Sequence, residues 1–322
     1  RGRNAPHERT SPAELAAWGD PGPVRRPVRL ESLAFAGVAE LGKLIRQRQV
    51  TCLELTELAL ARLEDFGPNL ECVVTLLPER ARQRARELDG MLDRGEYLGP
   101  LHGIPYGAKD LLAVKGAPTT WGAAPYRDQV LDETATVVAK LDQAGAVLVA
   151  KLTLGALAWG DVWFGGKTRN PWNLDEGSSG SSAGSASAVA AGLVPFAIGT
   201  ETLGSIVSPS TRCGVTGLRP TFGRVSRAGA MALSWSMDKI GPIARSAVDC
   251  AMVFDAIRGA DPRDPTTGDA PFPYRHDQDL SGLRIGYLES AFAEDYPGRE
   301  QDHEALRELR YRGIDLVPVA FP

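Results

Sequence analysis

The sequence predicts an α/β fold built on a largely parallel or mixed β-sheet. The main observation is that short apolar strands alternate with helical segments from about residue 101 to the end of the chain. The composition agrees with this, because 43% hydrophobic and 24% charged residues are ordinary values for a globular protein. A chain of 322 residues can also bury a substantial core without disulfides or metals.

Two helices are predicted before the alternating region. Thr51 and Glu54 fit a capping box, and leucines follow at helical spacing. We expect Phe66-Gly-Pro68 to end this helix, because proline removes a backbone hydrogen bond. A second helix is expected over residues 78–94, which Gly95 follows directly.

The alternating region itself contains three expected helices and four expected strands. Each strand is a compact apolar run. The helices are expected over residues 134–143, 247–257 and 300–312, and the strands over residues 146–150, 193–198, 283–288 and 314–319.

The first 28 residues differ from the rest of the chain. Five prolines lie among charged residues there, which predicts an extended or disordered arm. We therefore expect an arm over residues 1–28 and one domain over residues 29–322. No signal-peptide pattern and no apolar run of membrane-spanning length are found, so a cytoplasmic protein without a membrane partner is expected.

Charge and the rarer residue types argue against several classes of function. The net charge of −4 provides no basic excess for nucleic-acid binding. The four cysteines form no C-x-x-C pair, and the four histidines form no H-E-x-x-H pattern. No metal and no cofactor are therefore expected, and the cysteines are expected to be reduced structural thiols.

Every residue from 177 to 187 is Gly, Ser or Ala. By composition alone, such a run is a flexible linker. However, it continues directly into a helix-like stretch that ends at Gly192, and a strand and a second glycine-rich turn follow. This position between core elements argues against a linker between domains.

The second turn reads GTETLGS at residues 199–205 and ends at a candidate nucleophile, Ser205. Small residues let consecutive backbone N–H groups converge on one point, where they stabilise an oxyanion. The candidate donors are the N–H groups of Thr202, Leu203, Gly204 and Ser205. The alternative is an ordinary turn between a strand and a helix.

A serine nucleophile needs a base, and a lysine can provide it where burial lowers its pKa. Lys109 is the candidate, because the small and apolar residues around it suit a partly buried strand. The alternative is a surface lysine paired with Asp110.

Residues 180–221 closely resemble the amidase signature family. GSSAGSASAVAAG at 180–192 is similar to the family's serine-rich segment, and GTETLGSIVSPSTRCGVTGLRPT at 199–221 is similar to its nucleophile segment. Further similar segments lie at 103–110, 168–172 and 233–245, and the resemblance extends from about residue 35 to the end. It implies the amidase signature fold, a central mixed β-sheet covered by helices on both faces.

The resemblance also implies amide hydrolysis by a Ser-cisSer-Lys triad. Position by position, Ser205 matches the nucleophile, Ser181 the bridging serine on a cis peptide, and Lys109 the base. In the implied mechanism, neutral Lys109 accepts a proton through Ser181, and Ser205 forms an acyl-enzyme that water then hydrolyses. The implied partner is a small-molecule amide, and a homodimer is left open.

The chain departs from the family pattern at several positions. Leu203 stands in place of a glycine, which narrows the allowed backbone angles. Glu201 replaces an aspartate and Val207 an arginine, while Ser179 and Ala183 replace glycines. Family members are also considerably longer, so the C-terminal part that completes the sheet is expected to be missing here.

Three other interpretations stay open. Gly180-x-Ser182-x-Gly184 formally fits the nucleophile elbow of an α/β-hydrolase, with His276 or His303 as base, although no apolar strand precedes it. The chain also fits the amidotransferase subunit of the same family, which supplies ammonia to a misacylated tRNA, or an inactive member that acts as a binding protein. The aromatic candidates for a pocket lining are Trp121, Tyr126, Trp159, Trp163 and Trp235.

Overall fold

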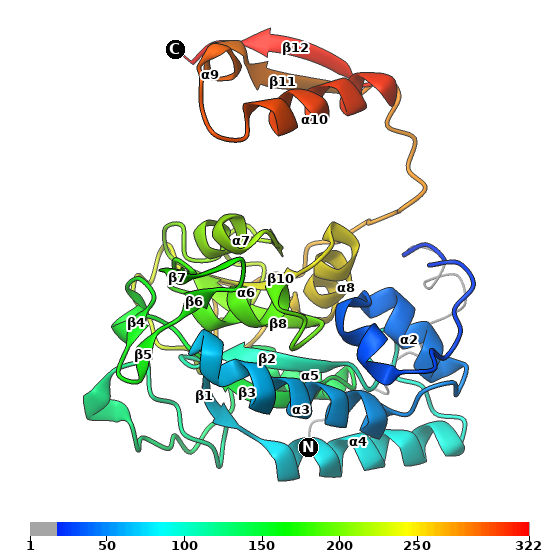
Figure 1. The fold of residues 1–322 in the computed structure, drawn as a ribbon, viewed down its shortest axis with the longest axis vertical. Helices are drawn as coiled ribbons and strands as arrows, with labels where there is room; N and C mark the ends of the chain where they lie inside the picture. Colours follow the sequence, from blue (N-terminus) through cyan, green and yellow to red (C-terminus); the bar gives the residue numbers. More distant parts are fainter. Residues whose placement is uncertain (1–17, 322) are drawn as a thin grey trace. The chain divides into compact units, whose positions relative to one another are not determined.

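A six-stranded mixed sheet forms the centre of the larger of two units. The computed structural model describes residues 18–321, and the chain divides into two units between Tyr274 and Arg275 (Figure 1). The sheet order is β1-β3-β2-β8-β10-β9. Its strands are β1 (Val73–Leu76), β2 (Pro105–Lys109), β3 (Val147–Leu152), β8 (Phe196–Glu201), β9 (Thr216–Gly217) and β10 (Lys239–Ala244).

The centre of this sheet is parallel and its flanks are antiparallel. β2 pairs in parallel with both β3 and β8, whereas β1, β9 and β10 run antiparallel to their neighbours. Helix α5 (Thr136–Gln143) connects β2 to β3, as a parallel pair requires. Every residue of β2, β3 and β8 is buried, which is typical of strands covered on both faces.

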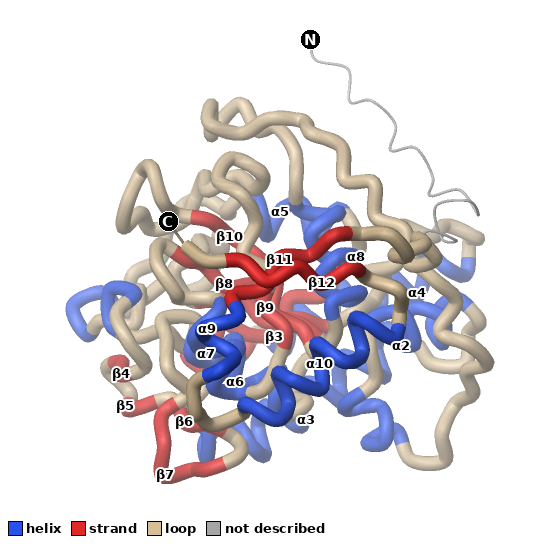
Figure 2. The backbone as a smooth tube through the Cα atoms, turned by 90° about the horizontal axis from the view of Figure 1, so that it is seen from above, coloured by secondary structure: helices blue, strands red, loops and turns tan. Residues whose placement is uncertain are grey.

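Helices cover both faces of the sheet. α5 packs against β3 and against α8 (Ala247–Ile257), and α8 packs against β10. α3 (Cys52–Leu70) and α6 (Ala183–Ala190) pack against each other and against β2 and β3. Figure 2 shows the sheet between α5 on one side and α3 and α6 on the other. The predicted α/β fold with a mixed sheet is therefore confirmed.

The two helices predicted near the N-terminus are present. Thr51 forms the predicted capping box with Glu54 at the start of α3. α4 spans Pro78–Asp93 and is followed by Gly95, which has a φ of +81°. The predicted end of α3 is wrong, because the helix continues past Pro68 to Leu70. A proline in the last turn removes only one hydrogen bond, and two more residues complete the turn.

Most other predicted elements lie within two residues of their expected positions, but β8 is displaced. It begins at Phe196 instead of residue 193, since Pro195 has no N–H to donate to the sheet. It also continues through Gly199 and Thr200, which pair with β10. The chain is therefore part of the sheet as far as Glu201, and only Thr202 to Ser205 form the turn.

The segment of residues 177–187 is not a linker. It runs from the end of β7 (Asn173–Gly177) into α6, whose residues Ala183 to Val189 are all buried. Small side chains are required for this close packing, because a Cβ added to Gly184 would lie 2.5 Å from the backbone nitrogen of Thr153. The linker interpretation is therefore wrong.

The second unit, residues 275–321, contains the two strands and the helix predicted there. β11 (Arg284–Leu288) and β12 (Asp315–Val319) pair in parallel, and α10 (Arg299–Tyr311) connects them. The remaining described elements of the chain are η1 (Leu30–Phe35), α2 (Val38–Arg46), η2 (Ala124–Tyr126), η3 (Ala156–Ala158), β4 (Val162–Trp163), β5 (Gly166–Lys167), β6 (Arg169–Asn170), α7 (Val207–Cys213) and α9 (Glu289–Ala293). None of the helices between residues 18 and 321 combines the length and the apolar content needed to cross a bilayer.

The predicted arm falls partly within the described residues. Residues 1–17 lie outside them. Val24 is buried in the core of the first unit, and the Arg26 guanidinium donates to the Glu54 carboxylate over 2.7 Å. Residues 18–28 thus pack against the rest of the first unit. The division into an arm and one domain stays a prediction.

Candidate active site

Lys109, the last residue of β2, is fully buried with an exposed fraction of 0%. Its Nζ donates to Ser181 Oγ over 2.8 Å and to Ser182 Oγ over 3.1 Å. It also donates to Thr200 Oγ1 over 2.9 Å and to the Thr200 carbonyl over 3.3 Å. The alternative of a surface lysine paired with Asp110 is wrong, because the Asp110 carboxylate pairs with Lys151.

The environment of Lys109 favours the neutral amine. Burial lowers the pKa of Lys109 well below its ordinary value of 10.5, and the carboxylates of Asp238 and Glu201 oppose this shift only in part. A lysine with a lowered pKa loses its proton more readily, and the neutral amine can accept a proton as a base.

Ser181 and Ser182 lie between β7 and α6 and connect this segment to the sheet. The peptide bond between Gly180 and Ser181 is cis, and Ser181 is 1% exposed. Ser182 Oγ accepts from the Thr200 N–H and donates to the Thr200 carbonyl, both over 3.1 Å. Ser182 is therefore occupied in fixing this segment against β8, and its side chain is buried.

Ser205 lies on the turn between β8 and α7. The Glu201 carboxylate accepts from the N–H groups of Ile206 over 2.8 Å and Val207 over 3.0 Å, which fixes the start of α7. Gly204 has a φ of +87°, whereas Leu203 is not among the residues with positive φ. The expected restriction by Leu203 is therefore absent, and its side chain is 81% exposed.

Glu201 remains a carboxylate in this buried position. Burial opposes its ionisation, but backbone N–H groups, those of Val207 and Ile206 foremost, outweigh burial and hold the pKa of Glu201 below its ordinary value. The guanidinium of Arg219 lies 3.6 Å from the same carboxylate. The longer side chain that stands in place of the family's aspartate thus anchors the turn in this chain.

Three of the four predicted oxyanion donors have no acceptor among the described residues. These are the N–H groups of Thr202, Leu203 and Ser205, which make no hydrogen bond to any residue between 18 and 321, whereas that of Gly204 points to Glu201. The N–H groups beyond them, of Ile206 and Val207, are bonded to Glu201. The turn therefore presents unbonded donors next to the Ser205 hydroxyl.

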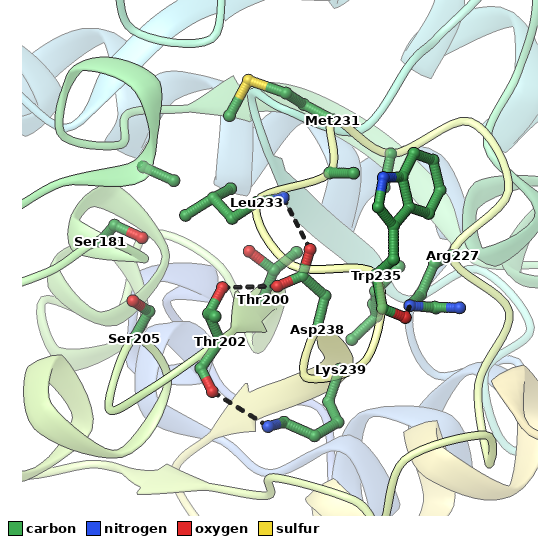
Figure 3. Close-up of a pocket in the computed structure, with 14 residues that line it drawn as sticks. Ser181, Thr200, Thr202, Ser205, Arg227, Met231, Leu233, Trp235, Asp238 and Lys239 are labelled. Atoms are coloured by element: carbon green, nitrogen blue, oxygen red, sulfur yellow. Dashed lines mark hydrogen bonds between the residues drawn. The ribbon is translucent and has the colours of Figure 1, made fainter.

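The hydroxyls of Ser181 and Ser205 meet at one pocket (Figure 3). Their segments are joined by a hydrogen bond from the Ser182 N–H to the Ser205 carbonyl over 3.1 Å. The opposite wall is formed by the loop before β10 and is largely apolar. It includes Ala230, Met231, Ala232, Leu233 and Trp235.

A second, more polar pocket borders the same two serines. It is lined by charged side chains and two large apolar ones, Trp159 and Leu203. The charged residues are Asp161, Lys167, Asp175, Glu176 and Arg212. Of the predicted aromatic candidates, Trp235 and Trp159 line the two pockets, whereas Trp121 packs against Tyr126 and Trp163 against Phe164.

Asp110, the residue directly after Lys109, forms a buried ion pair with Lys151. Lys151 Nζ donates to Asp110 Oδ1 over 2.6 Å and to Thr119 Oγ1 over 3.0 Å, and both charged side chains have an exposed fraction of 0%. The second Asp110 oxygen accepts from the Thr120 N–H over 2.9 Å. The pair is thus satisfied on both sides and supports the end of β2.

Replacing Lys151 with methionine should lower the free energy of unfolding by about 3–5 kcal/mol, because it leaves the Asp110 charge buried without its partner. Urea unfolding followed by circular dichroism measures this. The matched control is Lys115→Met, since Lys115 pairs with Asp132 at the surface over 2.7 Å and should matter much less. Equal losses in both variants would contradict the assignment.

The contacts of Ser182 do not favour the alternative hydrolase site. Ser182 is buried and bonded to Thr200 and Lys109. His276 and His303 belong to the second unit, where His303 Nε2 bonds to the Phe292 carbonyl.

Sequence reasoning missed two residues of the site, Thr200 and Asp238. Thr200 was assigned to an irregular turn, but it lies in β8 and bonds to Lys109. Asp238 lies just before β10 and lines the pocket. Its position in the segment 233–245, which resembles a family segment, was the available signal.

The chain belongs to the amidase family, also called the amidase signature family, whose family model matches residues 54–322. Among curated proteins, it is 42% identical over 293 residues to a glutamyl-tRNA(Gln) amidotransferase subunit of Methylococcus capsulatus, a match that covers 88% of this chain and 60% of the relative. The chain thus spans about three fifths of the length of the curated relatives it matches.

Solved structures of a peptide amidase and of an amidotransferase subunit are also similar to this chain. The peptide amidase from Stenotrophomonas maltophilia is 37% identical with a TM-score of 0.84, and the match covers 91% of this chain and 63% of the peptide amidase. The corresponding glutamyl-tRNA(Gln) amidotransferase subunit from Thermotoga maritima is 30% identical with a TM-score of 0.79, and the match covers 92% of this chain and 63% of that protein.

Proposed function

We propose that this chain hydrolyses the C–N bond of carboxylic amides, with Ser205 as nucleophile, Ser181 as proton relay and Lys109 as base. One observation supports this most strongly. The buried Lys109 Nζ lies 2.8 Å from Ser181 Oγ, and Ser181 shares a pocket with Ser205. Family membership and the similarity to a peptide amidase agree with amide hydrolysis.

In the proposed reaction, neutral Lys109 takes the proton of Ser181 while Ser181 takes that of Ser205. Ser205 Oγ attacks the amide carbonyl carbon, and the oxyanion binds the N–H groups of the turn, those of Leu203 and Ser205 among them. The proton returns through Ser181 to the leaving nitrogen, the C–N bond breaks, and ammonia or an amine departs. Water then hydrolyses the Ser205 ester by the same relay and releases the acid.

The surroundings of Lys109 suit both of its protonation states. Four oxygen atoms, from Ser181, Ser182 and Thr200, lie within hydrogen-bonding distance of Nζ. When Lys109 is neutral, its nitrogen can accept from one of the hydroxyls. When it is protonated, the remaining oxygens accept from the ammonium, so the charge formed during the reaction is not left without partners.

The proposed base predicts the pH dependence of the reaction. Because only neutral Lys109 is active, kcat/KM should rise as pH passes through the pKa of Lys109 and then level off. Burial lowers that pKa, so the plateau should be reached well below pH 10.5, the ordinary value. A pH–rate profile checks this. A rate that still rises about tenfold per pH unit up to pH 10 would contradict an active lysine with a lowered pKa.

The apolar wall of the pocket predicts a preference for amides with an apolar group. A panel of primary amides, scored by ammonia release, should show higher kcat/KM for phenylalanine amide than for aspartate amide. Absence of ammonia release from every amide would contradict the proposed function.

The cytoplasm stays the proposed location, supported by four buried cysteines that form no disulfide.

A second candidate is the amidotransferase subunit that several relatives are named as. On this proposal the chain would release ammonia for transfer in a complex instead of acting alone. Co-purification with a tRNA-binding subunit would support it, and efficient hydrolysis of simple amides by the isolated chain would favour the first proposal. An inactive binding protein would neither hydrolyse amides nor react at Ser205.

A further inference from the structure

Asp238 joins the two walls of the pocket at Ser205. One oxygen of its carboxylate, Oδ1, accepts from Thr202 Oγ1 over 2.5 Å. The other, Oδ2, accepts from the N–H group of Leu233 over 2.7 Å (Figure 3). It also accepts from the N–H group of Ser234 over 3.0 Å. A single buried carboxylate therefore connects the turn that bears Ser205 to the loop that forms the apolar wall.

The next residue strengthens this connection. Lys239 Nζ donates to the carbonyl of Thr202 over 3.1 Å, so Thr202 is held at its side chain by Asp238 and at its backbone by Lys239. Thr202 directly follows the end of β8 and lies three residues before Ser205. Fixing Thr202 thus fixes the start of the turn whose N–H groups are the proposed oxyanion donors.

The start of the apolar wall is held by backbone contacts, because the Met231 N–H donates to the Leu111 carbonyl over 3.1 Å and Ala230 forms a β-bridge with Leu112. The part from Leu233 to Trp235 has fewer such contacts. Leu233 and Trp235 line the pocket but remain 44% and 79% exposed, so burial contributes little to their position. The Arg227 guanidinium donates to the Trp235 carbonyl over 2.6 Å and pairs with Asp264. Among the hydrogen bonds of residues 18–321, those of Asp238 link this loop to the Ser205 turn.

We propose that Asp238 is a positioning residue that couples the substrate-binding wall to the oxyanion turn through Thr202. The inference rests on the proposed function, because it assigns a role in that reaction. Hydrogen bonds to a carboxylate are stronger and shorter than neutral ones, and three of them converge here. Together they hold the apolar wall and Ser205 at a fixed distance and orientation. The reaction rate depends on this arrangement, because the substrate bound at the wall must be aligned with the nucleophile.

The test removes the link without removing the carboxylate. Thr202→Val keeps the shape and the backbone N–H of residue 202 but loses the hydroxyl. It should lower kcat, normalised to folded protein, by about tenfold or more, and Thr202→Ser should restore most of the loss. The matched control is Thr211→Val, which removes a hydroxyl bond to the Val207 carbonyl in α7 and should leave kcat unchanged.

A double-mutant cycle shows whether the effect passes through Asp238. In an Asp238→Ala background, Thr202→Val should cause no further loss of kcat, since the bond is already gone. If the two losses simply multiply, or if Thr202→Val has wild-type kcat, the proposed coupling is overturned. If Asp238→Ala does not fold, the kcat of Thr202→Val compared with Thr202→Ser and Thr211→Val still tests the proposed coupling.

Amide hydrogen exchange tests the link independently of activity. In the Thr202→Val chain, peptides covering residues 206–208 and 233–238, which contain hydrogen-bonded N–H groups, should exchange about tenfold faster than in the wild type, the ratio expected for one lost hydrogen bond. Unchanged exchange in both segments overturns the coupling. If the wild-type chain hydrolyses no amide but exchange changes as expected, the proposed function fails while the physical link between the two walls stands.

Discussion

Replacing Ser205 with alanine is expected to lower kcat for amide hydrolysis by at least roughly 10⁴-fold. The variant keeps the pocket, the turn and Lys109, but no atom remains that can form the acyl-enzyme. The backbone donors can still bind the substrate carbonyl, so KM should change far less than kcat. Initial rates of ammonia release over a range of amide concentrations give both parameters.

The control for this variant is Ser208→Ala. Ser208 lies on α7, three residues after Ser205, and its hydroxyl bonds only to the Ser179 hydroxyl over 2.8 Å among the described residues. It lines neither pocket at Ser205. We expect near wild-type kcat for Ser208→Ala, and comparable activity in both variants would show that Ser205 is not the nucleophile.

Lys109→Met is expected to lower kcat by roughly 10³-fold and to remove the acid limb of the pH–rate profile. Methionine fills a similar volume but cannot accept a proton, so Ser181 loses the base behind it. Lys109→Arg should fail as well, because an arginine stays protonated at any accessible pH. Pre-steady-state rates and a pH series on both variants measure the effect.

Lys109→Met also leaves the hydroxyls of Ser181, Ser182 and Thr200 without a shared partner, so a loss of stability must be separated from a loss of catalysis. Circular dichroism and rates normalised to folded protein achieve this. Lys115→Met, at the surface, is the control. A folded Lys109→Met variant that keeps the wild-type acid limb would contradict the role of Lys109 as base.

Local patterns in the sequence predicted much of the fold. The capping box of Thr51 and Glu54 marked the start of α3, and the apolar run of residues 247–257 coincides with α8. These features depend on neighbours in sequence, which a single chain reveals. The displaced start of β8 follows from Pro195, so even this error had a local cause.

The contacts that hold the site together join residues far apart in sequence, and no local pattern predicts them. Lys151 is 41 residues from Asp110, yet it pairs with the carboxylate that the alternative interpretation assigned to Lys109. Asp238 reaches Thr202 across 36 residues. Sequence reasoning could thus identify Ser205, Ser181 and Lys109 through resemblance, but the network around them depends on how β2, β8 and β10 meet in the sheet.

The most direct test of the proposed function is mass spectrometry of the folded chain after reaction with a fluorophosphonate. The proposed relay predicts one covalent adduct per chain, located at Ser205 by peptide mapping. The adduct should be absent in Ser205→Ala and form much more slowly in Lys109→Met. A folded chain that does not react, or that carries the adduct at Ser182, would contradict Ser205 as the activated nucleophile.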